Sequence, residues 1–185
     1  MIFIARLTGM TATERSTRDR LLDAFETLLV TAGSRSATLD AVAAEAETSK
    51  GGLLYHFHSK DELVEGMLDR LRVQGAADAA RMKTARLGPV DYYLKTSINS
   101  GSDFDRALIA AGRIAQESDS RASAALADLR DGWFTVLADH LDDEALARTI
   151  QLIGDGLYFD DTTGLAEKSA VKHVRTILKR LDVLP

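Results

Sequence analysis

The stretch from Thr38 to Lys60, TLDAVAAEAETSKGGLLYHFHSK, constrains the fold of this 185-residue chain more than any other. It contains two short helical patterns separated by a tight turn. Thr38 is a good N-cap for the first pattern and Ser49 for the second, because a hydroxyl accepts a hydrogen bond from a backbone N–H of the first helical turn. Helices of about two turns are not stable alone. We therefore expect both to pack on neighbouring helices.

Longer helices are predicted on both sides of this stretch. Apolar residues recur at helical spacing over Thr17–Ala32, and Gly33 ends that pattern. Ser59 and Glu62 have the spacing of a capping box, which predicts a fourth helix that continues towards Gly88-Pro89. We place a domain boundary inside this fourth helix, so that the helix connects the two domains directly.

Five more helical patterns follow, and no strand pattern interrupts them. Their predicted ranges are Pro89–Ile98, Asp103–Gln116, Asp119–Leu141, Asp143–Gly164 and Lys168–Leu181. The chain has only 2 Pro and is dominated by helix-tolerant residues, which favours an all-α fold. The predicted organisation is a disordered tail (1–13), a three-helix N-terminal domain (14–62) and a C-terminal helical domain (63–185).

Composition excludes several classes of protein. Without Cys, the chain has no disulfide framework and no thiolate metal site, which fits a cytoplasmic location. No run approaches 18 apolar residues, so no membrane span is expected. The net charge is −5, and residues 1–58 carry six Arg/Lys and seven Asp/Glu. Any nucleic-acid contact must therefore depend on a local arrangement of charge.

No catalytic or metal site is evident. His56 and His58 do not share a helix face well, and no third ligand accompanies them. Asp155, Asp160 and Asp161 form a local carboxylate cluster without a nucleophile, a phosphate-binding loop or a zinc motif. We therefore expect no enzyme activity, no cofactor and no bound metal.

The pattern TLDAVAAEAETSKGGLLYHFHSKDEL resembles the DNA-binding domain of the TetR family of bacterial repressors. The match runs from about Thr17 to Leu71, and its motifs occur in order and spacing: a Thr-capped short helix, an A-x-x-S turn, a glycine after Ser-Lys, an aromatic-His-Phe cluster and S-K-x-x-L. The C-terminal part matches in helix count and length only. Two departures are Glu47, where many members have Gly, and an aromatic residue one place later than usual, at Tyr55.

The resemblance implies a helix-turn-helix whose second helix enters the DNA major groove. Ser49, Lys50, Gly51 and Gly52 would lie nearest the bases, the glycines letting the backbone come close. Phosphate contacts would come from Thr38, Tyr55, His56 and Lys60, two of them at helix N-termini that favour anions. Arg18, near Arg15 and Arg20, either serves the same partner or belongs to a solvated basic helix end.

The last two helices carry more apolar surface than one packed face requires. A helix apolar on two faces must bury both, either within its own chain or against a second subunit. We predict an isologous four-helix homodimer interface. Its residues are Leu152, Gly156, Phe159, Val171, Val174 and Leu178.

Aromatic residues of the C-terminal domain are candidate walls of a ligand pocket, and otherwise plain core, because small-molecule sites are mostly apolar with a few polar groups. The candidates are Tyr92, Phe104, Leu108, Arg113, Trp133 and Tyr158. We therefore predict a homodimeric, ligand-responsive transcriptional regulator, a repressor released from a palindromic double-stranded DNA operator by a small apolar or amphipathic molecule. The alternative is a helical protein–protein adaptor with the same fold and no specific DNA binding, which the acidic net charge favours.

Overall fold

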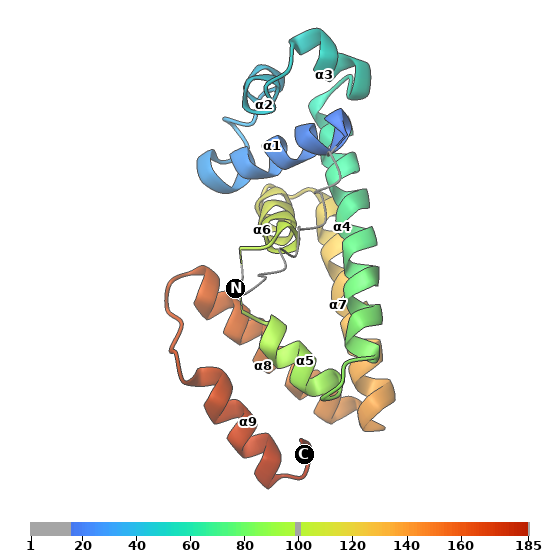
Figure 1. The fold of residues 1–185 in the computed structure, drawn as a ribbon, viewed down its shortest axis with the longest axis vertical. Coiled ribbons are helices and arrows are strands. Elements are labelled where there is room, and N and C mark those ends of the chain that lie inside the picture. Colours follow the sequence, from blue (N-terminus) through green and yellow to red (C-terminus); the bar gives the residue numbers. More distant parts are fainter. Residues whose placement is uncertain (1–15, 99–100, 185) are drawn as a thin grey trace, which may run out of the picture.

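The computed structural model describes residues 16–98 and 101–184, and these residues form nine α-helices and no strand (Figure 1). The all-α prediction is confirmed. The predicted tail, residues 1–13, lies outside the described residues, as does Arg15. The helices are α1 (Thr17–Ala32), α2 (Leu39–Glu45), α3 (Lys50–His56), α4 (Lys60–Lys83), α5 (Pro89–Thr96), α6 (Asp103–Gln116), α7 (Ser120–Leu141), α8 (Glu144–Thr162) and α9 (Ala170–Arg180).

The molecule is elongated along α4 and α7, which lie side by side (Figure 1). We call α1, α2 and α3 the head, and they lie at one end of α4. Helix α6 lies beneath the head, packed on α1, α4 and α7, and α5 and α8 follow further along the molecule. Helix α9 lies at the end away from the head. None of the described helices has the length and hydropathy that a membrane crossing needs.

The predicted N-caps form at the head. The backbone N–H of Ala41 donates to the Thr38 hydroxyl at 3.2 Å, and that of Gly52 donates to the Ser49 hydroxyl at 3.0 Å. At α4 the Ser59 half of the capping box forms, but the Glu62 carboxylate instead accepts from the backbone N–H of His58 at 2.8 Å. The reciprocal bond is thus made one residue earlier than predicted.

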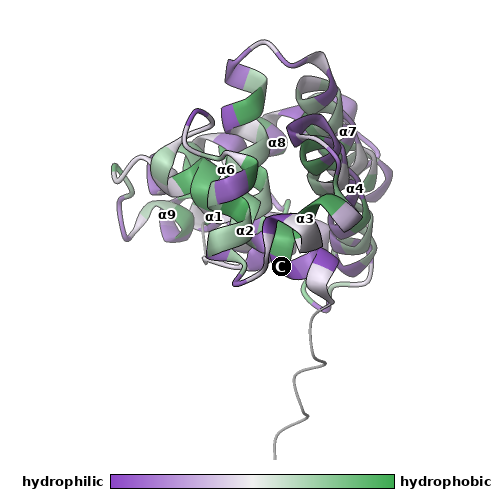
Figure 2. Ribbon diagram, turned by 90° about the horizontal axis from the view of Figure 1, so that it is seen from above, coloured by the Kyte–Doolittle hydropathy of each residue, from purple (hydrophilic) through white to green (hydrophobic). Residues whose placement is uncertain are grey.

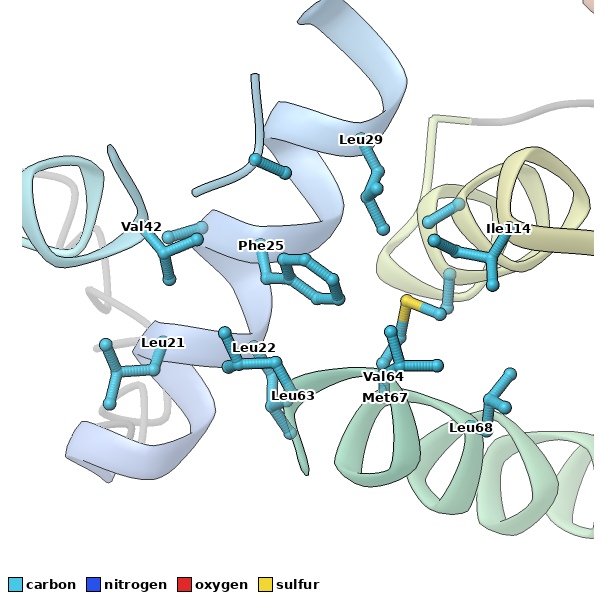
Figure 3. Close-up of a cluster of buried hydrophobic side chains, with 14 of the residues drawn as sticks. Leu21, Leu22, Phe25, Leu29, Val42, Leu63, Val64, Met67, Leu68 and Ile114 are labelled. Atoms are coloured by element: carbon cyan, nitrogen blue, oxygen red, sulfur yellow. The ribbon is translucent and has the colours of Figure 1, made fainter. Parts of the chain in front are cut away.

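The head shares its hydrophobic core with the C-terminal domain. Leu22, Phe25 and Leu29 of α1 are fully buried, and Figure 3 shows them between Val42 of the head and Ile114 of α6. Seen from the head end, Figure 2 shows hydrophobic residues on α1 and α6 where these two helices meet. A movement of α6 therefore cannot occur without a response from α1, because close-packed interiors transmit displacement.

A second buried cluster lies further from the head. It joins α5, α7, α8 and α9 through side chains that include Leu94, Leu137, Ile150 and Leu178. The buried carboxylate of Asp91 on α5 pairs with Arg175 of α9, Oδ1 to Nη2, at 2.6 Å. Helix α9 is therefore attached to its own chain by an ion pair as well as by apolar contact.

Candidate nucleic-acid interface and ligand cavity

Helix α3 presents one face to its own core and another to solvent. Leu53 is fully buried and anchors the helix, while Tyr55 is 82% exposed. Gly51 precedes Tyr55 by four residues and is also exposed, so the two share one outer helix face. An exposed tyrosine of this size on a rigidly anchored helix is available to a partner.

The two glycines of α3 have different surroundings. A Cβ on Gly51 would meet nothing closer than 3.9 Å, whereas one on Gly52 would lie 2.7 Å from the Thr48 hydroxyl oxygen. A side chain at position 52 would therefore require the Thr48 side chain to move. The approach of an outside backbone to both glycines stays a prediction, and of the two Gly51 has the more open surroundings.

Each predicted cation of the head already has a partner in the protein. Lys50 Nζ lies 2.9 Å from Asp40 Oδ1 in an exposed pair, and Lys60 Nζ donates to the Ser34 carbonyl oxygen at 2.5 Å. The Arg18 guanidinium lies 5.1 Å from the centroid of the Phe57 ring. Exposed ion pairs contribute at most about 1 kcal/mol, so Lys50 can exchange Asp40 for a phosphate, whereas the half-buried Lys60 ties α4 to the loop after α1.

The remaining residues predicted to contact DNA are the two N-caps and His56. Thr38 and Ser49 are exposed, although their hydroxyls accept from their own helices. The half-buried His56 ring packs edge-on against Tyr55, with ring centroids 5.1 Å apart. The predicted set thus lies at the N-caps of α2 and α3, on α3, and in the first turns of α1 and α4.

A cavity of about 630 Å³ lies below the head, with walls from α4 to α8. Four of the six predicted pocket residues line it: Phe104, Leu108, Trp133 and Tyr158. The other two need correction. Tyr92 lies behind the wall and donates from its hydroxyl to Asp78 at 2.7 Å. Arg113 is exposed on α6, because its position on the helix directs it away from the cavity.

Two carboxylates in the cavity wall were not predicted. Asp78 of α4 accepts from Trp133 Nε1 at 2.9 Å, and Asp105 of α6 lies 3.4 Å from the Tyr158 hydroxyl that donates to it. Asp78 could have been found from its spacing, because it falls on the buried stripe of Leu71, Gly75 and Met82. A search for apolar residues at helical spacing passes over such a residue, because it registers apolar side chains only.

The tyrosines of the cavity are held neutral. Burial raises the pKa of Tyr158 well above its usual value, and the neighbouring Asp105 carboxylate raises it further. Burial and Asp155 raise the pKa of the Tyr93 hydroxyl in the same way. Both side chains therefore act as phenol donors with apolar ring faces.

An ion-pair network connects the cavity helix α6 to the head. Arg106 of α6 lies 3.0 Å from Asp23 and 3.2 Å from Glu26, both on α1. Arg70 of α4 contacts the same two carboxylates at 2.9 and 2.6 Å. Glu26 is fully buried, and its desolvation raises its pKa despite the two guanidinium groups. The network joins α1, α4 and α6 at one point.

The predicted dimer face is only partly available on the surface. Leu152 and Phe159 are 59% and 60% exposed, and Gly156 faces open space. Val171 and Val174 of α9 are half-buried. Leu178 needs correction, because it is buried inside its own chain, so we remove it from the predicted interface.

Gly154 differs from Gly156. A Cβ there would lie 2.4 Å from the Tyr93 ring. This glycine therefore permits the close approach of α8 to α5 within one chain, and not of α8 to a second subunit. Exposed large apolar side chains at this end of the chain are instead Ile177 of α9 and Leu181, its C-cap.

The sequence matches two family profiles. One, described as bacterial regulatory proteins of the tetR family, matches residues 21–67, and the other, described as a tetracyclin repressor-like C-terminal domain, matches residues 88–183. Two curated proteins of Pseudomonas putida, the HTH-type transcriptional regulator SrpR and the uncharacterized HTH-type transcriptional regulator TtgW, are each 37% identical over 65 residues, or 35% of this chain. The match spans only 30% of SrpR and 47% of TtgW.

The fold is also similar to that of solved structures. A transcriptional regulator from Saccharomonospora viridis, solved in complex with choline, matches with a TM-score of 0.69 and 18% identity, over 88% of this chain and 95% of that chain. The C-terminal profile alone spans more than half of the chain, and the head carries the matching helix-turn-helix. The chain therefore belongs to the TetR family of bacterial regulatory proteins.

Proposed function

We propose that this protein is a ligand-responsive transcriptional repressor, which binds a palindromic operator as a homodimer and releases it when a small molecule enters the cavity. The observation that carries the proposal is the head itself, in which buried Leu53 fixes α3 while Tyr55, Lys50 and Gly51 remain exposed. The names of the two P. putida relatives, both HTH-type transcriptional regulators, support it.

In the proposed complex α3 lies in the major groove with its N-terminal residues at the base edges. Lys50 leaves Asp40 and binds a base edge or a phosphate, because the exposed pair is weak. Tyr55 and the N-termini of α2 and α4 contact the DNA backbone, which positions the head without specifying sequence. Residues 14–62 thus contact DNA, and residues 63–185 bind the ligand and the second subunit.

Release is proposed to begin at α6. This helix places Phe104 and Leu108 in the cavity wall. Arg106, which lies between them in the sequence, contacts α1. A ligand that prefers a shifted α6 moves α1 and the first half of α4, and with them the spacing of the two recognition helices. The ligand must bind the two states with different affinity, and a difference of about 1–3 kcal/mol is typical.

The cavity and the fold support a small-molecule effector. The cavity volume of about 630 Å³ is in the usual range for ligand sites. The S. viridis regulator of similar fold was solved with choline, so this architecture can hold a small molecule. The second subunit is proposed to cover the exposed apolar residues of α8 and α9, chiefly Leu152, Phe159 and Ile177.

A protein–protein adaptor is the competing function, favoured by the net charge of −5. DNA binding measured on the gene's own upstream region decides between the two. For a repressor, Lys50→Ala and Tyr55→Ala should each weaken binding by about tenfold, corresponding to roughly 1.4 kcal/mol. The control is Lys83→Ala on the far end of α4, which should change nothing. Equal binding by all three variants, or no loss of affinity with rising salt, would reject the operator function.

A further inference from the structure

The charged groups of the cavity differ in depth. The Asp78 side chain is 8% exposed, whereas the Arg81 side chain that pairs with it is 60% exposed. Asp105 is also buried, while Arg130 and Lys95 are 46% and 45% exposed. The buried part of the wall therefore carries negative charge, and the positive groups lie towards solvent.

The exposed positive groups of the cavity are already paired. Arg81 contacts Asp78 at 3.2 Å, and Lys95 contacts Asp91 at 2.7 Å. Arg130 pairs with Asp155. An anionic ligand would have to displace one of these carboxylates and then approach Asp78 and Asp105. That approach is unfavourable, because like charges repel more strongly where water is excluded.

Neutral hydrogen-bond donors in the wall and behind it point at the same two carboxylates. Asp78 accepts from the Tyr92 hydroxyl and from Trp133 Nε1, and Asp105 accepts from the Tyr158 hydroxyl. The cation that contacts Asp78 is Arg81, whose side chain is 60% exposed, so a ligand cation can take its place beside the buried carboxylate. The raised pKa of Tyr158, caused by burial and by Asp105, agrees with a negative local environment.

Aromatic rings form part of the apolar wall of the cavity. The centroid of Trp133 lies 5.8 Å from that of Tyr93 and 6.3 Å from that of Phe104, so three rings form one continuous wall. Aromatic faces attract cations through their quadrupole, and the attraction grows when the cation is desolvated. The same rings favour the apolar body of a ligand.

We propose, resting on the effector site of the proposed function, that the effector is a bulky organic cation. Its apolar groups lie on the rings of Trp133, Phe104 and Tyr158, and its positive charge lies near Asp78 and Asp105. A ligand of this class links α4 to α6, because the two carboxylates belong to those helices. It therefore acts on the two elements that reach the head.

The test uses two hydrophobic ions of matched shape and opposite charge, tetraphenylphosphonium and tetraphenylborate. Trp133 is the only tryptophan in the sequence, so its fluorescence reports occupancy directly. We expect the phosphonium to quench it saturably and to bind at least about tenfold more tightly than the borate. Equal affinity, tighter borate binding or no binding by either ion would overturn the proposal.

Two variants, each of which replaces one aspartate of α4 by asparagine, test where the cation binds. Asp78→Asn should reduce phosphonium affinity by about tenfold and narrow its preference over the borate. Asp69→Asn, on the exposed side of the same helix, should leave both affinities unchanged. Circular dichroism and thermal unfolding confirm that each variant is folded. Equal phosphonium affinity of the two variants would overturn the assignment of Asp78.

Operator binding is measured separately, without either ion. Selective phosphonium binding by a protein that ignores its upstream DNA would keep the ligand class and reject the repressor function. Operator binding that the borate releases, and the phosphonium does not, would keep the repressor and reject the organic cation.

Discussion

Glu47 lies in the turn between α2 and α3 with a φ of 52°, in the left-handed region. A residue with a Cβ is strained there by roughly 1 kcal/mol, and glycine is not. Its carboxylate also adds negative charge beside the proposed DNA-binding helix. Glu47 stands where many members of the family have Gly, and its positive φ is a conformation that glycine adopts without strain.

Two substitutions separate these effects. Glu47→Gly should raise the free energy of unfolding by about 0.5–1 kcal/mol and also tighten DNA binding by roughly two- to fivefold at low salt. Glu47→Gln keeps the strain and removes the charge, so it should tighten DNA binding with little change in stability. Urea unfolding and fluorescence anisotropy measure the two quantities. A glycine variant no more stable than the glutamine variant would mean that the turn carries no strain.

At the scale of elements, the helix ranges were predictable from the sequence, and the contacts between helices were not. The range of α1 was predicted to the residue, because a Ser-Thr start, an apolar stripe and Gly33 all agree locally. The cavity was found only in part, since periodicity groups Trp133 and Phe104 as apolar but gives no sign that they flank one another across α6 and α7. Asp78 and Arg106 make hydrogen bonds to residues 14 to 83 positions distant, and a single sequence gives no visible sign of such pairings.

Arg106 is the residue by which α6 contacts the charged side of α1. Arg106→Ala leaves Glu26 buried with one guanidinium fewer, and the free energy of unfolding should fall by about 2–3 kcal/mol. Arg113→Ala, at an exposed site on the same helix, should cost less than about 0.5 kcal/mol. Chemical denaturation compares the two, and equal losses would mean that the network does not stabilise the head on α6.

Arg106→Lys tests coupling in a folded protein. Lysine keeps the charge but loses the two-pronged contact with Asp23 and Glu26. We expect this variant to bind effector with unchanged affinity and to release DNA less completely at saturation. Full release would show that the shared apolar core between α1 and α6 is sufficient to transmit the ligand's effect.

At the scale of the whole molecule, the head and the proposed dimer face lie on different helices that α4 and α7 connect (Figure 1). In the proposed homodimer, the distance between the two α3 helices is therefore set by how each subunit's α4 is held relative to α8 and α9. The cavity lies between these parts, lined by α4 on one side and α8 on the other. A ligand there can change the spacing of the heads without touching DNA or the subunit interface.

The dimer itself can be tested at Phe159, whose exposed ring lies on α8 in register with Gly156 and Leu152. Phe159→Glu should dissociate the homodimer, because a desolvated charge at an interface costs several kcal/mol. Val73→Glu on α4 alters an even more exposed apolar residue outside the proposed face and should leave the dimer intact. Sedimentation equilibrium gives the mass of each variant. A dimeric Phe159→Glu protein would exclude this face.

The same variant links assembly to DNA binding. A monomer engages one half-site, and it loses the gain that arises when the second head binds at high effective concentration, typically 10²–10⁴-fold. Phe159→Glu should therefore bind a full palindrome and an isolated half-site with similar affinity, while Val73→Glu keeps the preference for the palindrome. If a monomeric variant retained that preference, dimerisation would not be what aligns the two heads. Specific operator binding would then have to come from single heads. Residues 1–58 carry more acidic than basic groups, and Lys50 pairs with Asp40, so a single head is poorly equipped to supply that specificity.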